Sequence, residues 1–227
     1  MAVTENQMET CIIACETLKD ELNLVMKGRS SALPVRWIDS GSHISQEKMR
    51  LAVQEAIDAL PAAYTTVLLL FGFCGNAMLG INAGNRTLVL PRVTDCIPLF
   101  LGSRAERESY GTGTYFFTGG LFNSPGGIIA QAENVCARYG KKRGLSVMRK
   151  MLAAYRAFAL IDTGAFDTAE VYGRVNDFSK LFDIPLKLIP GNLRLINALV
   201  SAEWPPEEFL LVKPGGSITF EDSLNAA

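Results

Sequence analysis

The sequence TTVLLLFGFCGNAMLGINAGNRTLVLPRVTDC, residues 65–96, is central to the fold, because it holds two short apolar runs that each lead into a cysteine. Residues 67–73 and 87–90 are too few for a membrane span or a full helix, and they are rich in side chains that suit buried strands. We therefore predict two central strands with Cys74 and Cys96 at their carboxyl ends. Ligands of open parallel α/β sheets bind outside these strand ends, so the two thiols predict a functional site there.

The length and composition are those of a globular protein. The chain has 227 residues, of which 48% are hydrophobic and 20% charged, and this is enough for one large α/β domain. Two sub-lobes, residues 1–110 and 111–227, are an open alternative within that domain. No apolar run approaches about 18 residues, and the polar start MAVTENQMET lacks the regions of a signal peptide, so we expect a cytoplasmic protein with no membrane partner.

Charge and cysteine content argue against two further classes. A formal net charge of −1 gives no field that would gather nucleic acid, so we expect no nucleic-acid partner. Five cysteines is an odd number and, in a chain expected in the cytoplasm, indicates reduced thiols rather than a disulfide framework. One local basic cluster is interpreted as a solvated helix face; it consists of Arg138, Lys141, Lys142, Arg143, Arg149 and Lys150.

Strands and helices alternate along the rest of the chain. Residues 10–15 and 34–39 predict strands that are each followed by a helix. Residues 128–154 predict one long or broken helix, interrupted near Gly140 and Gly144. Later strands, each ending in a Gly-rich or Asp-bearing turn, are predicted at residues 113–118, 157–162, 186–189 and 209–212. This alternation predicts an α/β fold with a mostly parallel, doubly wound sheet, or two facing α/β halves.

Four potential metal ligands follow predicted strands. They are Cys15, His43, Cys74 and Cys96, and a parallel sheet would place them along one edge. Three thiolates and an imidazole suit zinc or another soft metal, and cysteine-rich pockets also hold iron–sulfur clusters. The chain has no CxxC pair, and an equally open interpretation is that these cysteines are core residues and the lone histidine a hydrogen-bonding one. For Cys136, inside a predicted helix, we expect core packing.

Turn residues in both halves of the chain predict a binding site for a small polar or anionic molecule. Glycine allows backbone N–H groups to approach a ligand, and a helix that begins after Asn192 would add its dipole, with Arg194 supplying charge. An ordinary helix cap is the alternative for this last segment. The candidate ligand-binding residues are Asn76, Gly119, Gly120, Asp162, Gly191, Asn192 and Arg194.

Three residues are candidates for catalysis. Cys74 is a potential nucleophile, and Asp95 and Asp162 are potential bases, although either carboxylate can equally be a helix N-cap. The sequence has no P-loop, no GxGxxG after the first strand, no GxSxG elbow and no HExxH. These absences argue against nucleotide hydrolysis, dinucleotide-dependent redox chemistry, the usual esterases and zinc proteases.

Four segments carry a family resemblance. IIAC, FGFCGN, LVLPRVTDCIPLFLGS and GTYFFTGG, in this order, resemble a family of bacterial and archaeal proteins catalogued as a domain of unknown function, DUF 1638, over nearly the whole chain. Genes of that family often lie beside those of corrinoid-dependent methyltransferases, so the resemblance implies a role in one-carbon metabolism. It also implies the same set of ligands, Cys15, His43, Cys74 and Cys96. The chain departs from the expected pattern at Thr94, where a histidine is expected, and at Leu121, where an aromatic residue is expected.

We therefore expect a metal-binding protein with zinc or an iron–sulfur cluster at the strand ends, acting in corrinoid and methyl metabolism. Zinc with an open position would activate a substrate thiolate or methyl acceptor as a Lewis acid. An alternative is a non-enzymatic accessory protein that carries a metal, cluster or corrinoid to a corrinoid protein or methyltransferase partner. A third interpretation is a thiol enzyme with Cys74 as the nucleophile.

Overall fold

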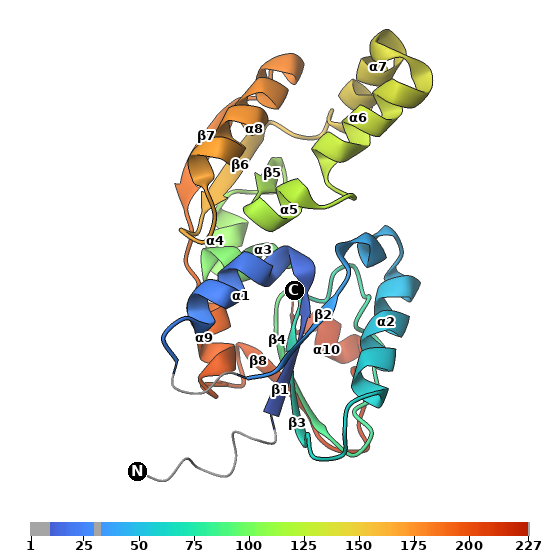
Figure 1. Cartoon of the computed structure of the whole chain (residues 1–227), viewed down its shortest axis with the longest axis vertical. Helices are drawn as coiled ribbons and strands as arrows, with labels where there is room; N and C mark the ends of the chain where they lie inside the picture. The colour runs from blue at the N-terminus through green and yellow to red at the C-terminus, as the bar shows by residue number, and fades with distance from the viewer. Residues whose placement is uncertain (1–9, 30–32, 227) are drawn as a thin grey trace.

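A computed structural model describes residues 10–29 and 33–226, and these form a mixed α/β structure with two sheets (Figure 1). The larger sheet has the strand order β2-β1-β3-β4-β8, and the smaller sheet has the order β5-β6-β7. The strands of the larger sheet are β1 (Thr10–Cys15), β2 (Val35–Ile38), β3 (Thr66–Leu70), β4 (Thr87–Pro91) and β8 (Phe209–Val212). Those of the smaller sheet are β5 (Thr114–Phe117), β6 (Ala157–Asp162) and β7 (Leu186–Pro190).

The strand pairs are mostly parallel, as the sequence predicts. β1 lies between β2 and β3, and β3 pairs with β4, all in parallel. The exception is β8, which pairs antiparallel with β4 at the sheet edge, with Leu90 opposite Leu210. The smaller sheet is parallel throughout. Both faces of the parallel strands are covered, which explains why β1 and β3 are almost uniformly apolar.

Helices cover both faces of the larger sheet. In Figure 1, α1 (Lys19–Met26) and α9 (Arg194–Val200) lie on one side and α2 (Gln46–Asp58) on the other. The Ser45 hydroxyl accepts a hydrogen bond from the Lys48 amide and thereby caps α2. The remaining helical segments of this lobe are η2 (Glu16–Leu18), η3 (Ser40–Ile44), α3 (Ile97–Leu101), α4 (Arg104–Ser109) and α10 (Phe220–Leu224).

The smaller lobe carries a helical hairpin. The helices of this lobe are α5 (Gly119–Asn123), α6 (Ile128–Tyr139), α7 (Lys141–Met151) and α8 (Thr168–Phe182), and α6 and α7 form the hairpin. The predicted long helix is broken once, at Gly140, whose φ of 79° lies in the left-handed region that glycine tolerates best. Gly144 lies inside α7 instead. A Cβ there would come 2.6 Å from the Cys136 sulfur, so glycine at this position lets α6 and α7 pack closely.

Each lobe has its own core, and β5 and β6 contribute to both. Phe158 and Leu160 of β6 belong to the core of the smaller lobe, whereas Ala159 and Ile161 belong to the larger core. Successive residues of a strand point to opposite faces, so one face of the smaller sheet packs toward the larger lobe. The larger core also includes residues of α9 and β8, and the end of the described chain therefore packs with its beginning.

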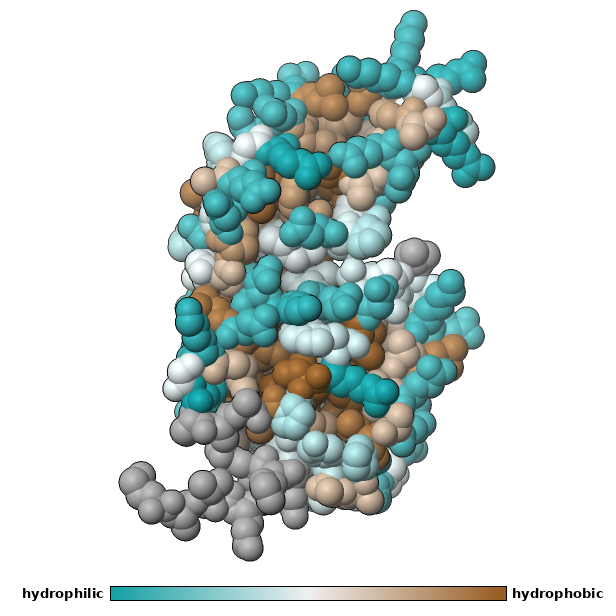
Figure 2. Space-filling model, in the orientation of Figure 1, coloured by the Kyte–Doolittle hydropathy of each residue, from teal (hydrophilic) through white to brown (hydrophobic). Residues whose placement is uncertain are grey.

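The segments that follow the strands of the two sheets meet at a seam between the lobes. The Thr163 hydroxyl, after β6, donates to the Glu21 carboxylate on α1, at 2.9 Å. The Asn192 amide, after β7, donates to the Phe100 carbonyl on α3, at 2.7 Å. The seam lies at the carboxyl ends of the parallel strands, and Figure 2 shows the surface hollowed on one side between the lobes.

Among the described helices, none is long and apolar enough to cross a membrane.

Candidate functional site

Three cysteines follow adjacent strands of the larger sheet at its carboxyl edge. Cys15 is the last residue of β1, while Cys74 and Cys96 follow β3 and β4. The segments after β3 and β4 continue side by side, because the Cys74 amide donates to the Thr94 carbonyl at 2.9 Å. Cys74 is therefore aligned with the residues that immediately precede Cys96. The strand order β1-β3-β4 places all three thiols in neighbouring positions, as expected from the sequence.

The three thiols influence one another electrostatically. Burial raises the pKa of Cys74 to about 12, and negative charge on Cys15 and Asp95 contributes to the rise. Burial likewise raises the pKa of Cys96 well above its usual range. Negative charge on Cys74, Asp95 and Cys15 raises it further, by smaller amounts. The pKa of Cys15 is also raised, mainly by burial. In the absence of a cation, the protein therefore holds three neutral thiols at neutral pH.

The turn that carries Cys74 has an unusual backbone. Cys74, Gly75 and Asn76 have φ values of 47°, 66° and 74°, three consecutive residues in the left-handed region. Two of these are not glycine, and such conformations cost free energy and concentrate at functional sites. A Cβ at Gly75 would come 2.8 Å from the side-chain nitrogen of Gln46, the first residue of α2. The start of α2 therefore lies over the cysteine-bearing turn.

His43 belongs to η3, the segment directly before α2. Its side chain lies outside the described part of the structure. Among the side chains that are described, no three of the His, Cys, Asp and Glu residues are arranged so that they could hold a metal ion. The metal-ligand roles of Cys15, His43, Cys74 and Cys96 therefore stay predictions.

Asp95 connects the cysteine cluster to the edge of the smaller lobe. Its Oδ1 accepts a hydrogen bond from the Ile97 amide at 2.8 Å and thereby holds the turn before α3, although the N-cap residue of that helix is Cys96. Its Oδ2 lies 3.9 Å from Nε of Arg107 on α4, and this Nε is buried without a hydrogen-bond partner. The guanidinium stacks 4.8 Å from the ring centre of Phe116. The arrangement joins Arg107 of α4 to Asp95, the residue before Cys96.

Two polar side chains next to Cys15 were not predicted. The Thr17 hydroxyl lies 3.1 Å from the Cys15 sulfur and is almost fully buried. One helical turn later, Glu21 is completely buried; its Oε1 accepts from Thr163 and its Oε2 has no hydrogen-bond partner. Burial raises the pKa of Glu21 from 4.5 to about 7. The only sequence signal for Glu21 is its place on α1 next to the apolar Leu22.

The glycines of the second half that we predicted to approach a ligand approach protein atoms. A Cβ at Gly120 would overlap the Thr17 carbonyl, and one at Gly119 would come 2.7 Å from the Phe166 ring. Gly191 lies equally close to Thr163. Asp162 accepts hydrogen bonds from the Gly164 amide and the Thr168 hydroxyl, and it thereby holds its own loop. A ligand-binding role for these residues stays a prediction.

Arg194 and Asn192 are engaged within the protein as well. The Asn192 side chain accepts a hydrogen bond from the Arg194 amide at 2.9 Å and holds the turn before α9, although the N-cap residue of that helix is Leu193. The Arg194 guanidinium donates to Glu208 at 2.8 Å and to the Gly102 carbonyl at 2.9 Å. Its pKa is raised by the hydrogen bond to Glu208. Arg107, rather than Arg194, is the cation that lies near Asp95.

Comparison with known proteins identifies the family. The profile of the family described as "Protein of unknown function (DUF1638)" matches residues 37–200. The chain belongs to the DUF1638 family. No curated protein and no solved structure matches it. The DUF1638 match includes His43, Cys74 and Cys96, whereas Cys15 lies before it.

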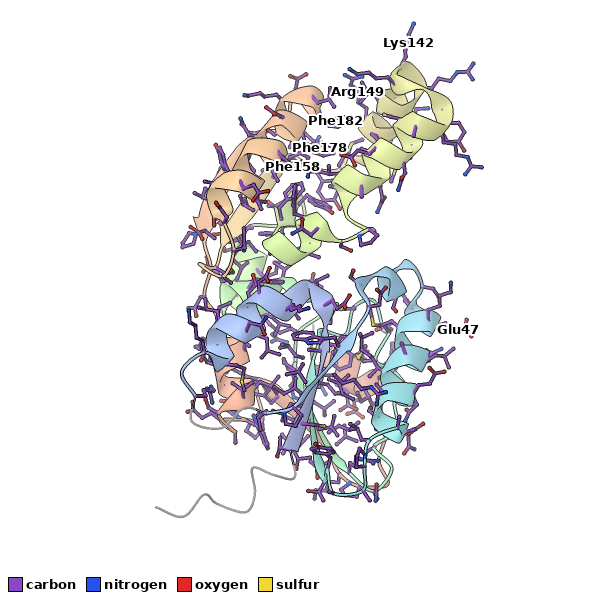
Figure 3. All side chains as sticks on the ribbon, viewed as in Figure 1. Glu47, Lys142, Arg149, Phe158, Phe178 and Phe182 are labelled. Carbon is purple, nitrogen blue, oxygen red and sulfur yellow. The ribbon has the colours of Figure 1, made fainter. Side chains whose placement is uncertain are left out.

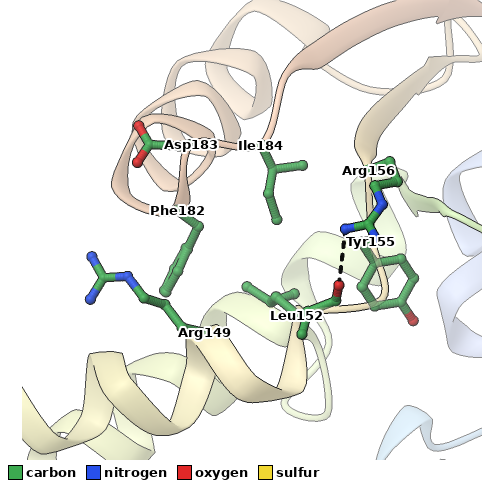
Figure 4. A pocket seen from close by; sticks show the side chains of 8 residues that line it. Arg149, Leu152, Tyr155, Arg156, Phe182, Asp183 and Ile184 are labelled. Carbon is green, nitrogen blue, oxygen red and sulfur yellow. Dashed lines mark hydrogen bonds between the residues drawn. The ribbon is translucent and has the colours of Figure 1, made fainter.

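The smaller lobe of this DUF1638 chain has a separate polar cavity of about 290 Å³. Figure 4 shows it between the end of α7 and the end of α8, with Phe182 and Ile184 on one side and Tyr155 on the other. The Arg156 guanidinium donates to the Ala153 carbonyl there, at 3.3 Å. The cavity is lined by residues of the smaller lobe alone, whereas the cysteine cluster belongs to the larger one.

Proposed function

We propose that the protein binds a soft metal ion, or an iron–sulfur cluster, through Cys15, Cys74 and Cys96 at the seam between the lobes. The observation that supports this proposal is the placement of three thiols after three adjacent parallel strands, on the edge where α/β proteins bind ligands, with Cys74 and Cys15 near enough to raise the pKa of Cys96. Thiolate sulfur selects zinc, copper(I) and iron–sulfur clusters over hard cations. His43 completes the set as a fourth ligand or a hydrogen-bonding partner.

The chemistry of the donors supports this assignment. Burial raises the pKa values of all three thiols, and the neighbouring thiols raise those of Cys74 and Cys96 further, so the thiolate forms are unfavourable without a positive charge. A bound cation removes this penalty, because a coordinating thiol is deprotonated by the metal.

We assign the site to one-carbon chemistry, as the family resemblance implies. Zinc bound there would supply Lewis-acid activation of a substrate thiolate or methyl acceptor. The chain's own contribution is to place the substrate. Arg107, with its unpartnered buried Nε, attracts an anionic group of the substrate to the seam. Asp95 fixes the direction of that guanidinium. It also holds the turn that carries Cys96 by accepting a hydrogen bond from the Ile97 amide.

Two other functions are weighed against this one. A thiol enzyme that uses Cys74 is less favoured, because a thiol with a pKa of about 12 supplies almost no thiolate at neutral pH. A non-enzymatic accessory protein for a metal, cluster or corrinoid shares the proposed site. The two metal-dependent functions differ in coordination: an enzyme keeps one exchangeable position, while a carrier or structural site is closed.

The decisive experiment is elemental analysis and a visible spectrum of protein purified without oxygen. We expect about one zinc ion, or iron with sulfide, per chain. Cys74→Ser and Cys96→Ser should lose most of the metal, and His43→Ala should lower metal affinity by about 10- to 100-fold. Cys136→Ser is the matched control and should keep full metal content, because Cys136 lies in the helical hairpin. Equal metal content in all four variants would refute the site.

A further inference from the structure

An apolar groove runs through the smaller lobe between the α6–α7 hairpin and α8. It encloses about 450 Å³. Figure 3 places the rings of Phe178 and Phe182 on the side of α8 that faces the hairpin, and Figure 2 shows apolar surface there bordered by hydrophilic residues. The apolar side chains that line the groove are Ile129, Ala132, Cys136, Leu145, Phe178 and Leu181.

The groove lies within the most positively charged part of the chain. Residues 128–151, which form the hairpin, contain six Lys and Arg residues and one Glu, a net charge of +5. Because the whole chain has a net charge of −1, the rest carries −6. Lys142 lies at the outer tip of the hairpin in Figure 3. The positive charge of this chain is therefore concentrated in the α6–α7 hairpin, which forms one side of the groove.

Four charged side chains line the groove. Lys141 begins α7, and Arg174 lies on α8. Two carboxylates lie on the same rim: Glu133, whose Oε1 is 3.4 Å from the Arg174 guanidinium, and Asp177. The two cations and two carboxylates of the lining cancel in net charge. The positive surplus around the groove therefore comes from the five hairpin cations outside the lining, Arg138, Lys142, Arg143, Arg149 and Lys150.

We propose that this groove binds a single-chain anionic amphiphile, an acyl chain that bears a carboxylate. Its volume lies in the range of about 300–1,000 Å³ typical of small-molecule sites. Six apolar side chains suit a hydrocarbon tail, while the surplus of positive charge selects an anionic head group. A small amphiphile fits better than a membrane surface, because the lining side chains form a recess between helices.

Cys136 provides a direct measurement of occupancy. It lines the groove and is half-buried. Burial raises the pKa values of Cys11 and Cys74 to about 11 and about 12, and those of Cys15 and Cys96 are raised too, so these four thiols should be alkylated slowly at pH 8. Iodoacetamide labelling of each cysteine is followed by peptide mass spectrometry. Sodium decanoate, kept below its critical micelle concentration, is the ligand that is added. Decanoate at ten times its Kd should slow the labelling of Cys136 about tenfold.

Matched probes and variants test the two parts of the proposal. Decyltrimethylammonium has the same tail and the opposite charge, and it should protect Cys136 far less. Ala132→Phe fills the groove and should abolish protection, whereas Ala137→Phe, on the exposed side of the same helix, should not. Lys141→Glu should weaken decanoate binding severalfold, and Lys142→Glu, which does not line the groove, should weaken it less. Circular dichroism verifies that each variant is folded, and Lys141→Glu keeps the test valid if Ala132→Phe does not fold.

Three results would overturn the proposal. One is equal protection of Cys136 by decanoate and by decyltrimethylammonium, which would leave only non-specific apolar binding. Another is binding of decanoate to folded Ala132→Phe with unchanged affinity. The third is protection by vesicles that contain anionic phospholipid but not by monomeric decanoate, which would make the hairpin a membrane-surface contact. None of these measurements depends on the metal content of the cysteine cluster.

Discussion

At the scale of single residues, the seam between the lobes contains a carboxylate with an unfavourable environment. Glu21 is fully buried, and only one of its two oxygens has a hydrogen-bond partner. Burial raises its pKa from 4.5 to about 7, because the ionised form loses water without gaining a cation. The folded protein therefore retains a proton that the unfolded chain releases at lower pH.

This residue should make stability depend on pH in a defined window. Between about pH 4.5 and pH 7 the folded state binds more protons than the unfolded state, so the free energy of unfolding falls as pH rises through that range. Glu21→Gln removes the dependence and should be more stable than the parent protein at pH 8, by about 3 kcal/mol at most. Urea unfolding at pH 4.5 and pH 8 measures the difference.

The control for that experiment is Glu55→Gln, because Glu55 is exposed on α2. It should change the free energy of unfolding by the same small amount at both pH values. A Glu21→Gln protein whose advantage does not grow between pH 4.5 and pH 8 would mean that the buried carboxylate is not protonated in the folded state.

The positions of the cysteines after strands were predictable at this scale, but the residues around them were not. Cys74 and Cys96 could be placed because an apolar run ends just before each of them. Arg107 and Thr163 could not, since they approach the site from a short helix and from a loop of the other lobe. Their contacts depend on how the two sheets face one another, and no local pattern encodes that.

At the scale of elements, the start of α5 is pressed against the segment that follows Cys15. A Cβ at Gly120 would overlap the Thr17 carbonyl. Gly120→Ala should therefore destabilise the protein by about 1–3 kcal/mol, because backbone atoms must move to relieve the overlap. Thermal or urea unfolding measures this directly.

Gly173→Ala is the matched control for the packing at Gly120. Gly173 lies inside α8, and a Cβ there would meet nothing within 4 Å. The same substitution should stabilise the protein by about 0.5–1 kcal/mol, because alanine favours a helix more than glycine does. Equal effects of the two substitutions would show that Gly120 is not needed for the close approach of the lobes.

The boundaries of several elements followed from the sequence alone. β1, β6 and β8 have the predicted limits, because an apolar run bounded by polar or turn residues fixes each of them. The break in the long hairpin helix was placed correctly at Gly140, but Gly144 was wrongly expected to contribute to it. A glycine that disrupts a helix cannot be told locally from one that allows a partner helix to approach.

At the scale of the whole molecule, the last part of the described chain completes the larger sheet. α9 packs on β3 and β4, and β8 pairs along the free edge of β4. The sequence could predict these elements but not their partners. Pairing between β4 and β8 joins residues more than a hundred positions apart, and an antiparallel edge strand has the same composition as a parallel one.

A chain that ends at Pro190 should therefore fail to form a stable larger lobe. It would lack β8, and the apolar surface beneath α9 would be uncovered. We expect such a protein to accumulate as insoluble aggregates or, if refolded, to unfold at much lower urea concentration than the parent. A soluble truncated protein with the parental urea midpoint would mean that α9 and β8 contribute little to the larger core.

Both connections between the two lobes pass through the seam. The polypeptide leaves the larger lobe after α3 and returns directly after β7, where the Asn192 amide donates to the Phe100 carbonyl. Exit and re-entry thus lie side by side. A lobe connected in this way is an insertion that a single genetic event can add, enlarge or exchange, because neither end of the larger sheet has to move. The cysteine-bearing edge can then stay fixed while the lobe that faces it changes in size.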